Sequence, residues 1–134
     1  MYRFVTALLF LVAATVSALA QSLPVPSYWQ NQRGSYMKLY SMDAQGNFIG
    51  VYMNNAEGFK CRFSVFNPPY KVTGSAHGAN VRFKVVWDNG VQNCHSTTVW
   101  HGRVIGQTMP TSWVLYGPGI NPPMYGNDIF QHLP

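Results

Sequence analysis

Prolines and glycines interrupt this chain so often after residue 21 that a long helix has no room to form. The 134-residue sequence contains 12 glycines and 9 prolines. No set of apolar residues repeats with helical spacing over ten positions beyond residue 21. Short β-branched and aromatic runs lie between the breaks, which is typical of strands joined by turns. The sequence therefore predicts an all-β protein.

Eight short strands are expected, most of them joined by hairpin-like turns. They cover residues 28–32, 35–42, 48–54, 70–76, 79–88, 95–105, 111–116 and 127–133. The segment GPGINPPMYG (117–126) is expected to be a loop because Pro and Gly dominate it. Strands of this length and spacing pack either as an up-and-down barrel or as a sandwich. An eight-stranded barrel can hold one small ligand inside.

The first 20 residues differ in character from the rest. Arg3 is followed by an apolar run over 7–16 and by the small-residue end ALA (18–20). This pattern is typical of a secretory signal peptide, and the run is too short to span the ~30 Å hydrocarbon core of a membrane. We expect cleavage after Ala20, which leaves residues 21–134 as one domain in the extracellular space or the periplasm.

The expected export also bears on the state of the two cysteines, Cys61 and Cys94. Export places them in an oxidising compartment, where a disulfide is the usual outcome; two buried free thiols are the alternative. A bridge would close a loop of roughly 33 residues, and the loss of chain entropy in the unfolded state would stabilise the fold by about 3–4 kcal/mol.

Charge and motif content argue against several function classes. The formal net charge is +5, but the cations are scattered along the chain rather than clustered as a nucleic-acid interface requires. No nucleophile elbow, zinc-ligand spacing or phosphate-binding loop is present in the sequence. We therefore expect no catalytic residue, no metal and no cofactor.

The face predicted to point inward is unusually polar for a barrel core. Taking every second residue of the expected strands gives Asn31, Arg33, Ser35, Phe48, Gly50, Tyr52, Asn54, Phe83, Val85, Trp87, Ser96, Thr98, Trp100, Trp113, Leu115, Asp128 and Phe130. A buried hydroxyl or amide without a partner costs about 1–3 kcal/mol. Either a polar ligand between aromatic walls or trapped water would satisfy these groups.

Five stretches also carry a resemblance to a known family: WQNQRGS (29–35), GNFIGVYMNNAEG (46–58), VVWDNGVQNCHSTTVWHG (85–102), TSWVLYG (111–117) and GNDIF (126–130). In this order and spacing the chain resembles the avidin and streptavidin family of biotin-binding proteins. It is most similar to the short dimeric avidins of the rhizavidin type. The resemblance implies an eight-stranded antiparallel up-and-down β-barrel that binds biotin non-covalently at one end, without catalysis.

The resemblance assigns the polar residues to the ureido head of biotin. Asn31, Ser35 and Tyr52 match the three donors to the ureido oxygen. Asp128 matches the acceptor for one ureido N–H, and Asn54 occupies the position that contacts the second ureido N–H. Three donors on one oxygen favour its oxyanion-like form, as in an oxyanion hole but without a reaction.

The resemblance assigns the remaining positions to the rest of the ligand. Thr98 would contact the thioether sulfur and Ser96 the valerate end. The apolar walls would be formed by Trp87, Trp100, Trp113 and Leu115. Cys61 and Cys94 match the paired cysteines of the rhizavidin type.

Three departures from the family pattern affect these expectations. Arg33 stands where avidin and streptavidin have Leu, and it could narrow the mouth, pair with Asp128 or point outward. The segment 117–126 lacks the Trp that tetrameric relatives lend to a neighbouring subunit, which favours a homodimer. The loop 55–69 is longer than in the rhizavidin type, and its Lys60 or Arg62 could meet the ligand carboxylate or form a solvated rim.

Two other binding functions remain as alternatives. A lipocalin-like barrel would carry a different small ligand, and a carbohydrate-binding module would stack sugars on exposed aromatic rings. The discriminating feature is whether Trp87, Trp100 and Trp113 line one cavity or lie on an open face.

Overall fold

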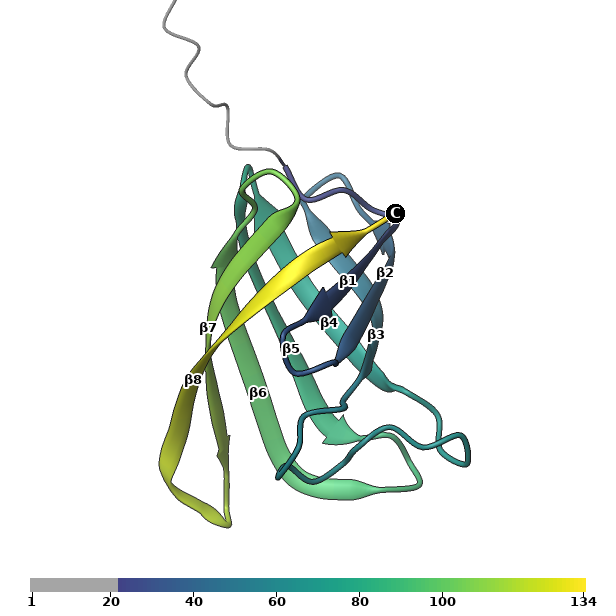
Figure 1. Ribbon diagram of the computed structural model, residues 1–134, viewed down its shortest axis with the longest axis vertical. Coiled ribbons are helices and arrows are strands. Elements are labelled where there is room, and N and C mark those ends of the chain that lie inside the picture. The colour runs from purple at the N-terminus through teal and green to yellow at the C-terminus, as the bar shows by residue number, and fades with distance from the viewer. Residues whose placement is uncertain (1–21) are drawn as a thin grey trace, which may run out of the picture.

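An eight-stranded antiparallel barrel is formed within residues 22–134, the part of the chain that the computed structural model describes (Figure 1). Its strands are β1 (Ser27–Asn31), β2 (Tyr36–Met42), β3 (Asn47–Met53), β4 (Tyr70–His77), β5 (Asn80–Asp88), β6 (Asn93–Arg103), β7 (Thr108–Gly117) and β8 (Ile120–Leu133). Each strand pairs with the next, and β1 pairs with β8, which closes the barrel. The predicted eight-stranded up-and-down barrel is confirmed; the predicted signal peptide, residues 1–20, lies outside the described residues.

Strand β5 shows how the sequence sets the two faces of the barrel. Its residues alternate between buried and exposed along the whole strand NVRFKVVWD. Val81, Phe83 and Val85 are buried, while Arg82 and Lys84 face solvent. This period-2 pattern is expected for a sheet with one dry face and one wet face.

The two ends of the barrel differ in their connections. The turn after β1, the long loop 54–69 after β3, and the turns after β5 and β7 lie at one end, the lower end in Figure 1. The other end carries the remaining turns and the C-terminus. Fully buried apolar side chains, among them Trp29, Leu39, Met109 and Phe130, form the core. Trp29 also stacks on His132, with ring centres 4.9 Å apart.

The prediction of a loop over 117–126 is wrong. Only Pro118 and Gly119 separate β7 from β8, and Gly117 pairs with Ile120 across the turn. Prolines are compatible with a strand when one of its edges is free of partners. Strand β8 meets β1 only from Phe130 onward, so Pro122 and Pro123 lie in a stretch that has β7 as its single neighbour.

Residues 22–134 include no helix with the length and apolar character that a membrane crossing requires.

Candidate ligand site at the open end of the barrel

A cavity of about 560 Å³ opens at the end of the barrel that carries the loop 54–69. Nine of the eleven residues predicted for the ligand site line it: Tyr52, Asn54, Trp87, Ser96, Thr98, Trp100, Trp113, Leu115 and Asp128. The other two, Asn31 and Ser35, are buried directly behind Tyr52 and Asn54. This volume lies in the range that holds one small molecule.

A network of amides and hydroxyls forms the polar wall. The Asn31 Nδ2 donates to the Tyr52 hydroxyl at 3.2 Å, and the Asn31 Oδ1 accepts from the amide of Ser35 at 3.0 Å. The Ser35 hydroxyl donates to Asn54 Oδ1 at 3.3 Å and accepts from the amide of Asn55 at 2.9 Å. Asn31, Ser35, Tyr52 and Asn54 therefore belong to one buried network that links β1, the following turn, β3 and the start of the loop after β3.

The Tyr52 hydroxyl is held in its protonated form. Burial is the main cause that raises the pKa of this phenol above its usual value, and the nearby charge of Asp128 adds to the effect. Since the hydroxyl oxygen already accepts from Asn31, its proton is the part that remains for donation.

Asp128, on β8, supplies a buried carboxylate to the cavity wall. Its side chain is 3% exposed, and it forms an ion pair with Arg33, whose Nε lies 3.0 Å from Asp128 Oδ1. The indole N–H of Trp100 donates to Asp128 Oδ2 at 2.9 Å. Of the three positions considered for Arg33, the structure shows the pairing with Asp128.

Gln32 supports this carboxylate, although the sequence pattern did not single it out. Its Nε2 donates to Asp128 Oδ1 at 3.1 Å and to the carbonyl of Asn127 at the same distance. Its Oε1 accepts from the amide of Ile129 at 2.8 Å. Gln32 belongs to the turn after β1, where strand alternation carries no information about side-chain direction.

The three tryptophans line one cavity, and each is at most 8% exposed. The Trp87 indole N–H donates to Thr98 Oγ1 at 2.8 Å, so the Thr98 proton is free to donate elsewhere. Trp100 stacks on Phe83 with ring centres 4.9 Å apart. Trp113 lies so close to Gly126 that a Cβ at that position would overlap its indole ring.

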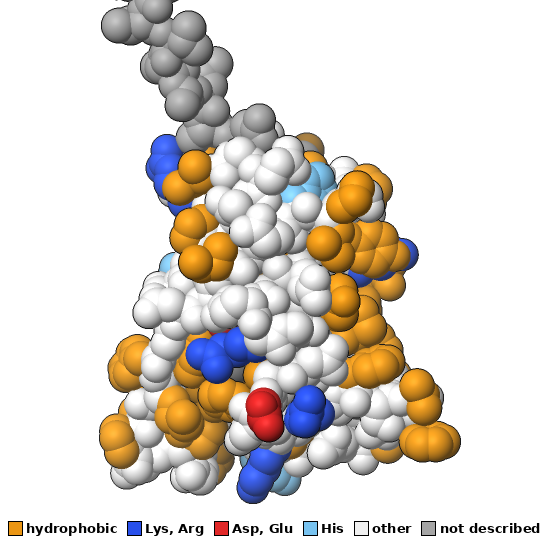
Figure 2. All heavy atoms as spheres, viewed as in Figure 1, with side chains coloured by type: hydrophobic (Ala, Val, Ile, Leu, Met, Phe, Trp, Pro, Cys, Tyr) orange, Lys and Arg blue, Asp and Glu red, His pale blue; other side chains and the backbone are white. Residues whose placement is uncertain are grey.

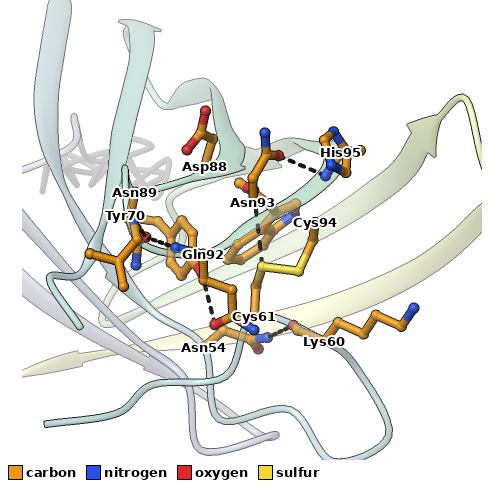
Figure 3. Close-up of a disulfide and its surroundings, with 12 residues drawn as sticks. Asn54, Lys60, Cys61, Tyr70, Asp88, Asn89, Gln92, Asn93, Cys94 and His95 are labelled. Atoms are coloured by element: carbon orange, nitrogen blue, oxygen red, sulfur yellow. Dashed lines mark hydrogen bonds between the residues drawn. A yellow bond between two sulfur atoms is a disulfide. The ribbon is translucent and has the colours of Figure 1, made fainter. Parts of the chain in front are cut away.

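The disulfide Cys61–Cys94 fixes the long loop against β6, as predicted (Figure 3). On the same loop, the carbonyl of Lys60 accepts from Asn54 Nδ2 at 3.0 Å. The loop also carries Phe59, which lines the cavity and meets Trp113 edge-on at 6.0 Å. Phe59 was not among the predicted site residues, and its position in an irregular loop provides no periodic signal.

Basic side chains lie among apolar ones at this end of the molecule (Figure 2). Lys60 and Arg62 are both exposed, and only Lys60 belongs to the residues that line the cavity. Residues 22–134 contain no cluster of three His, Cys, Asp or Glu side chains that could hold a metal ion.

The amino-acid sequence is similar to one family of known proteins and to individual members of it. The model of the Avidin family matches residues 20–119. Afifavidin from Afifella pfennigii is 40% identical over 104 residues, which cover 74% of this chain and 62% of afifavidin. Hoefavidin from Hoeflea phototrophica is 34% identical over 83 residues, which cover 57% of this chain and 48% of hoefavidin. The match thus spans less than two thirds of either relative's length.

A solved structure gives a comparison in three dimensions. The structure described as a rhizavidin–biotin complex is 38% identical to this chain, with a TM-score of 0.72. The superposition covers 83% of this chain and 93% of rhizavidin.

Proposed function

This chain belongs to the avidin family, and from that premise we propose that it binds biotin non-covalently in the cavity at the open end of the barrel. The observation that carries the proposal is the union of a buried polar network, a buried carboxylate and three tryptophans around one cavity of about 560 Å³. The solved complex of rhizavidin with biotin supports the choice of ligand.

The ureido oxygen of biotin is proposed to accept from Asn31, Ser35 and Tyr52. The Tyr52 proton is available because the hydroxyl oxygen is already engaged by Asn31. The Ser35 hydroxyl can rotate from Asn54 to the ligand while the amide of Asn55 continues to donate to its oxygen. That rotation also frees a lone pair on Asn54 Oδ1, which then accepts from one ureido N–H.

The second ureido N–H is proposed to donate to Asp128. A carboxylate offers about four acceptor positions, and three donors occupy this one in the structure: Gln32 and Arg33 on Oδ1, and Trp100 on Oδ2. The free acceptor position therefore lies on the Oδ2 side, next to the Trp100 indole.

The tryptophans are proposed to enclose the apolar part of biotin. A single aromatic ring can bury about 150–250 Å² of surface, so Trp87, Trp100 and Trp113 together supply most of the apolar contact, with Leu115 beside them. The free Thr98 proton would meet the thioether sulfur, and half-buried Ser96 would meet the valerate end.

The position of the tryptophans bears on the alternatives. A carbohydrate-binding module presents its rings on an open face, whereas these three rings line a cavity and are buried. A lipocalin-like carrier has no need for a carboxylate facing a network of hydrogen-bond donors. Both alternatives are therefore less well supported than biotin binding.

Titration of the purified protein with biotin tests the proposal, with tryptophan fluorescence and calorimetric heat as the two signals. We expect saturable binding of one biotin per chain. Asp128→Ala should weaken it by about 2–5 kcal/mol, because it removes a buried acceptor and leaves its donors unpaired. His101→Ala, on the exposed outer face, should leave binding unchanged. Absence of binding at millimolar biotin, or equal effects of the two variants, would count against the proposal.

We further propose that residues 1–20 are a cleaved signal peptide and that residues 21–134 form the exported, non-catalytic domain. N-terminal sequencing of protein recovered from the medium or periplasm would test this, with Gln21 expected as the first residue. We expect a homodimer, since the segment 117–126 carries no Trp to complete a neighbouring site. Light scattering after gel filtration would measure the oligomeric state.

A further inference from the structure

The cavity already holds a guanidinium group from this chain. Arg33 is 36% exposed, but its Nε lies 3.0 Å from the buried Asp128 carboxylate. The guanidinium carbon is 5.7 Å from the centre of the Phe59 ring and 6.0 Å from that of Trp113. Arg33 therefore lies between two aromatic residues of the cavity wall, with its charged end against the carboxylate.

This pairing changes what the cavity can accept. Among residues 22–134, Asp128 is the only acidic residue that lines the cavity, and its negative charge is compensated by Arg33. Lys60 also lines the cavity and has no carboxylate partner within the same range. A ligand that brought a cation next to Asp128 would meet the like charge of Arg33 instead of an uncompensated anion.

We propose that Arg33 is a specificity-determining residue, which favours a neutral cyclic urea at Asp128 and disfavours a cyclic guanidinium in the same place. A urea needs only the free lone pair on Asp128 Oδ2, which the ion pair leaves open. A guanidinium stays protonated at neutral pH and must bring its charge into the cavity. This inference rests on the proposed biotin-binding function and adds a reason for its selectivity.

Two probes test the inference: biotin, and its cyclic guanidinium analogue, in which an imino nitrogen replaces the ureido oxygen. Their dissociation constants are measured by calorimetry at pH 7 and one fixed ionic strength, and the ratio of analogue to biotin is compared between variants. We expect Arg33→Leu to lower this ratio at least tenfold, because it exposes an uncompensated carboxylate to the cationic probe. Arg33→Gln should lower the ratio in the same direction and serves as a second neutral variant should the leucine disturb folding.

Two further variants separate charge at Asp128 from other effects. Arg33→Lys keeps a cation on the same turn and should stay closer to the wild-type ratio than Arg33→Leu does. Lys60→Met removes a cavity cation that does not touch Asp128, and should shift the ratio less than Arg33→Leu. An equal shift in Lys60→Met, or Arg33→Lys behaving like Arg33→Leu, would overturn the assignment.

The outcome for the proposed function is read separately. If the wild-type protein fails to bind biotin, the proposed function itself is wrong. If biotin binds but both neutral Arg33 variants keep the wild-type ratio, only the inference about Arg33 is overturned. Thermal unfolding of each variant confirms that folded proteins are compared.

Discussion

Gln32 bonds to the Asp128 carboxylate and to the backbone of the residues that precede and follow Asp128 in β8. The side-chain amide of Gln32 pairs with the backbone of Asn127 and Ile129, at 3.1 and 2.8 Å, in the manner of a neighbouring strand. It also donates to the Asp128 carboxylate at 3.1 Å. Because β1 ends at Asn31, one residue before Gln32, a side chain continues the contact with β8 where the backbone ladder stops.

Gln32→Ala should weaken biotin binding several-fold. The variant removes one donor from Asp128 and two contacts to the β8 backbone, each worth about 0.5–1.5 kcal/mol. Part of that loss appears as lower stability and part as a less well-fixed carboxylate. Calorimetric titration together with thermal unfolding measures both parts. Gln131→Ala, at an exposed site on β8, is the matched control and should change neither the biotin affinity nor the unfolding temperature.

Gly126→Ala should displace the Trp113 indole and lower biotin affinity. A Cβ at Gly126 would overlap the ring, so the ring or the strand must shift, at a cost of about 1–3 kcal/mol in stability. Quenching of tryptophan fluorescence on titration should fall together with the affinity. Gly119→Ala adds the same methyl group at the cavity rim, where it meets no atom within 4 Å, and should behave as the wild type. Equal losses in both variants would show that the packing on Trp113 is not the cause.

The stability of the protein should fall as the pH rises above about 10, partly because of Tyr52. Burial raises the pKa of this phenol in the folded state, so the folded chain holds the proton more tightly than the unfolded chain. The contribution to stability is complete below the ordinary tyrosine pKa of about 10 and is lost as the pH rises further. Chemical denaturation between pH 8 and 11 should show this slope, and Tyr52→Phe should flatten it. Tyr125→Phe, at a site 76% exposed, is the control.

Removing the disulfide should lower both stability and the lifetime of the biotin complex. The bridge joins residues 33 positions apart, so replacing Cys61 and Cys94 by Ser should cost about 3–4 kcal/mol of unfolding free energy. The loop with Phe59 and Lys60 would then lose order in the free protein and would have to be fixed again on binding, which favours dissociation. Denaturant unfolding and competitive dissociation of labelled biotin measure the two effects. A reducing agent should reproduce them in the wild type and leave the double variant unchanged.

Sequence patterns predicted the barrel walls well because the relevant information is local. In β5 and in β6 from Ser96 onward, alternate residues face the barrel interior, so the period-2 pattern alone is enough to place Trp87, Thr98 and Trp100 on the inward face. The positions where strands begin and end are predicted less accurately. The first half of β8 was expected to be a loop, because its prolines are compatible with a strand only on an edge with a single neighbour. Which strand lies next to it is a property of the closed barrel and is absent from the local sequence.

The contacts that complete the site were also beyond local patterns. Arg33 had three reasonable positions, and the choice depends on Asp128, which is 95 residues away in the chain. Gln32 bonds to the backbone of β8, and Phe59 reaches the cavity from an irregular loop. Such contacts follow from how the turns meet at the open end, whereas the residues of the strands follow from their periodicity.

The paired prolines at the start of β8 have a consequence for the protein at high concentration. An exposed strand edge offers free N–H and C=O groups on which a second molecule can align a strand of its own. Pro122 and Pro123 have no N–H to offer, and they lie in the stretch that only β7 accompanies. Two positions of this edge therefore offer no N–H to a strand of a second molecule, which makes the hairpin a poorer template for polymerisation.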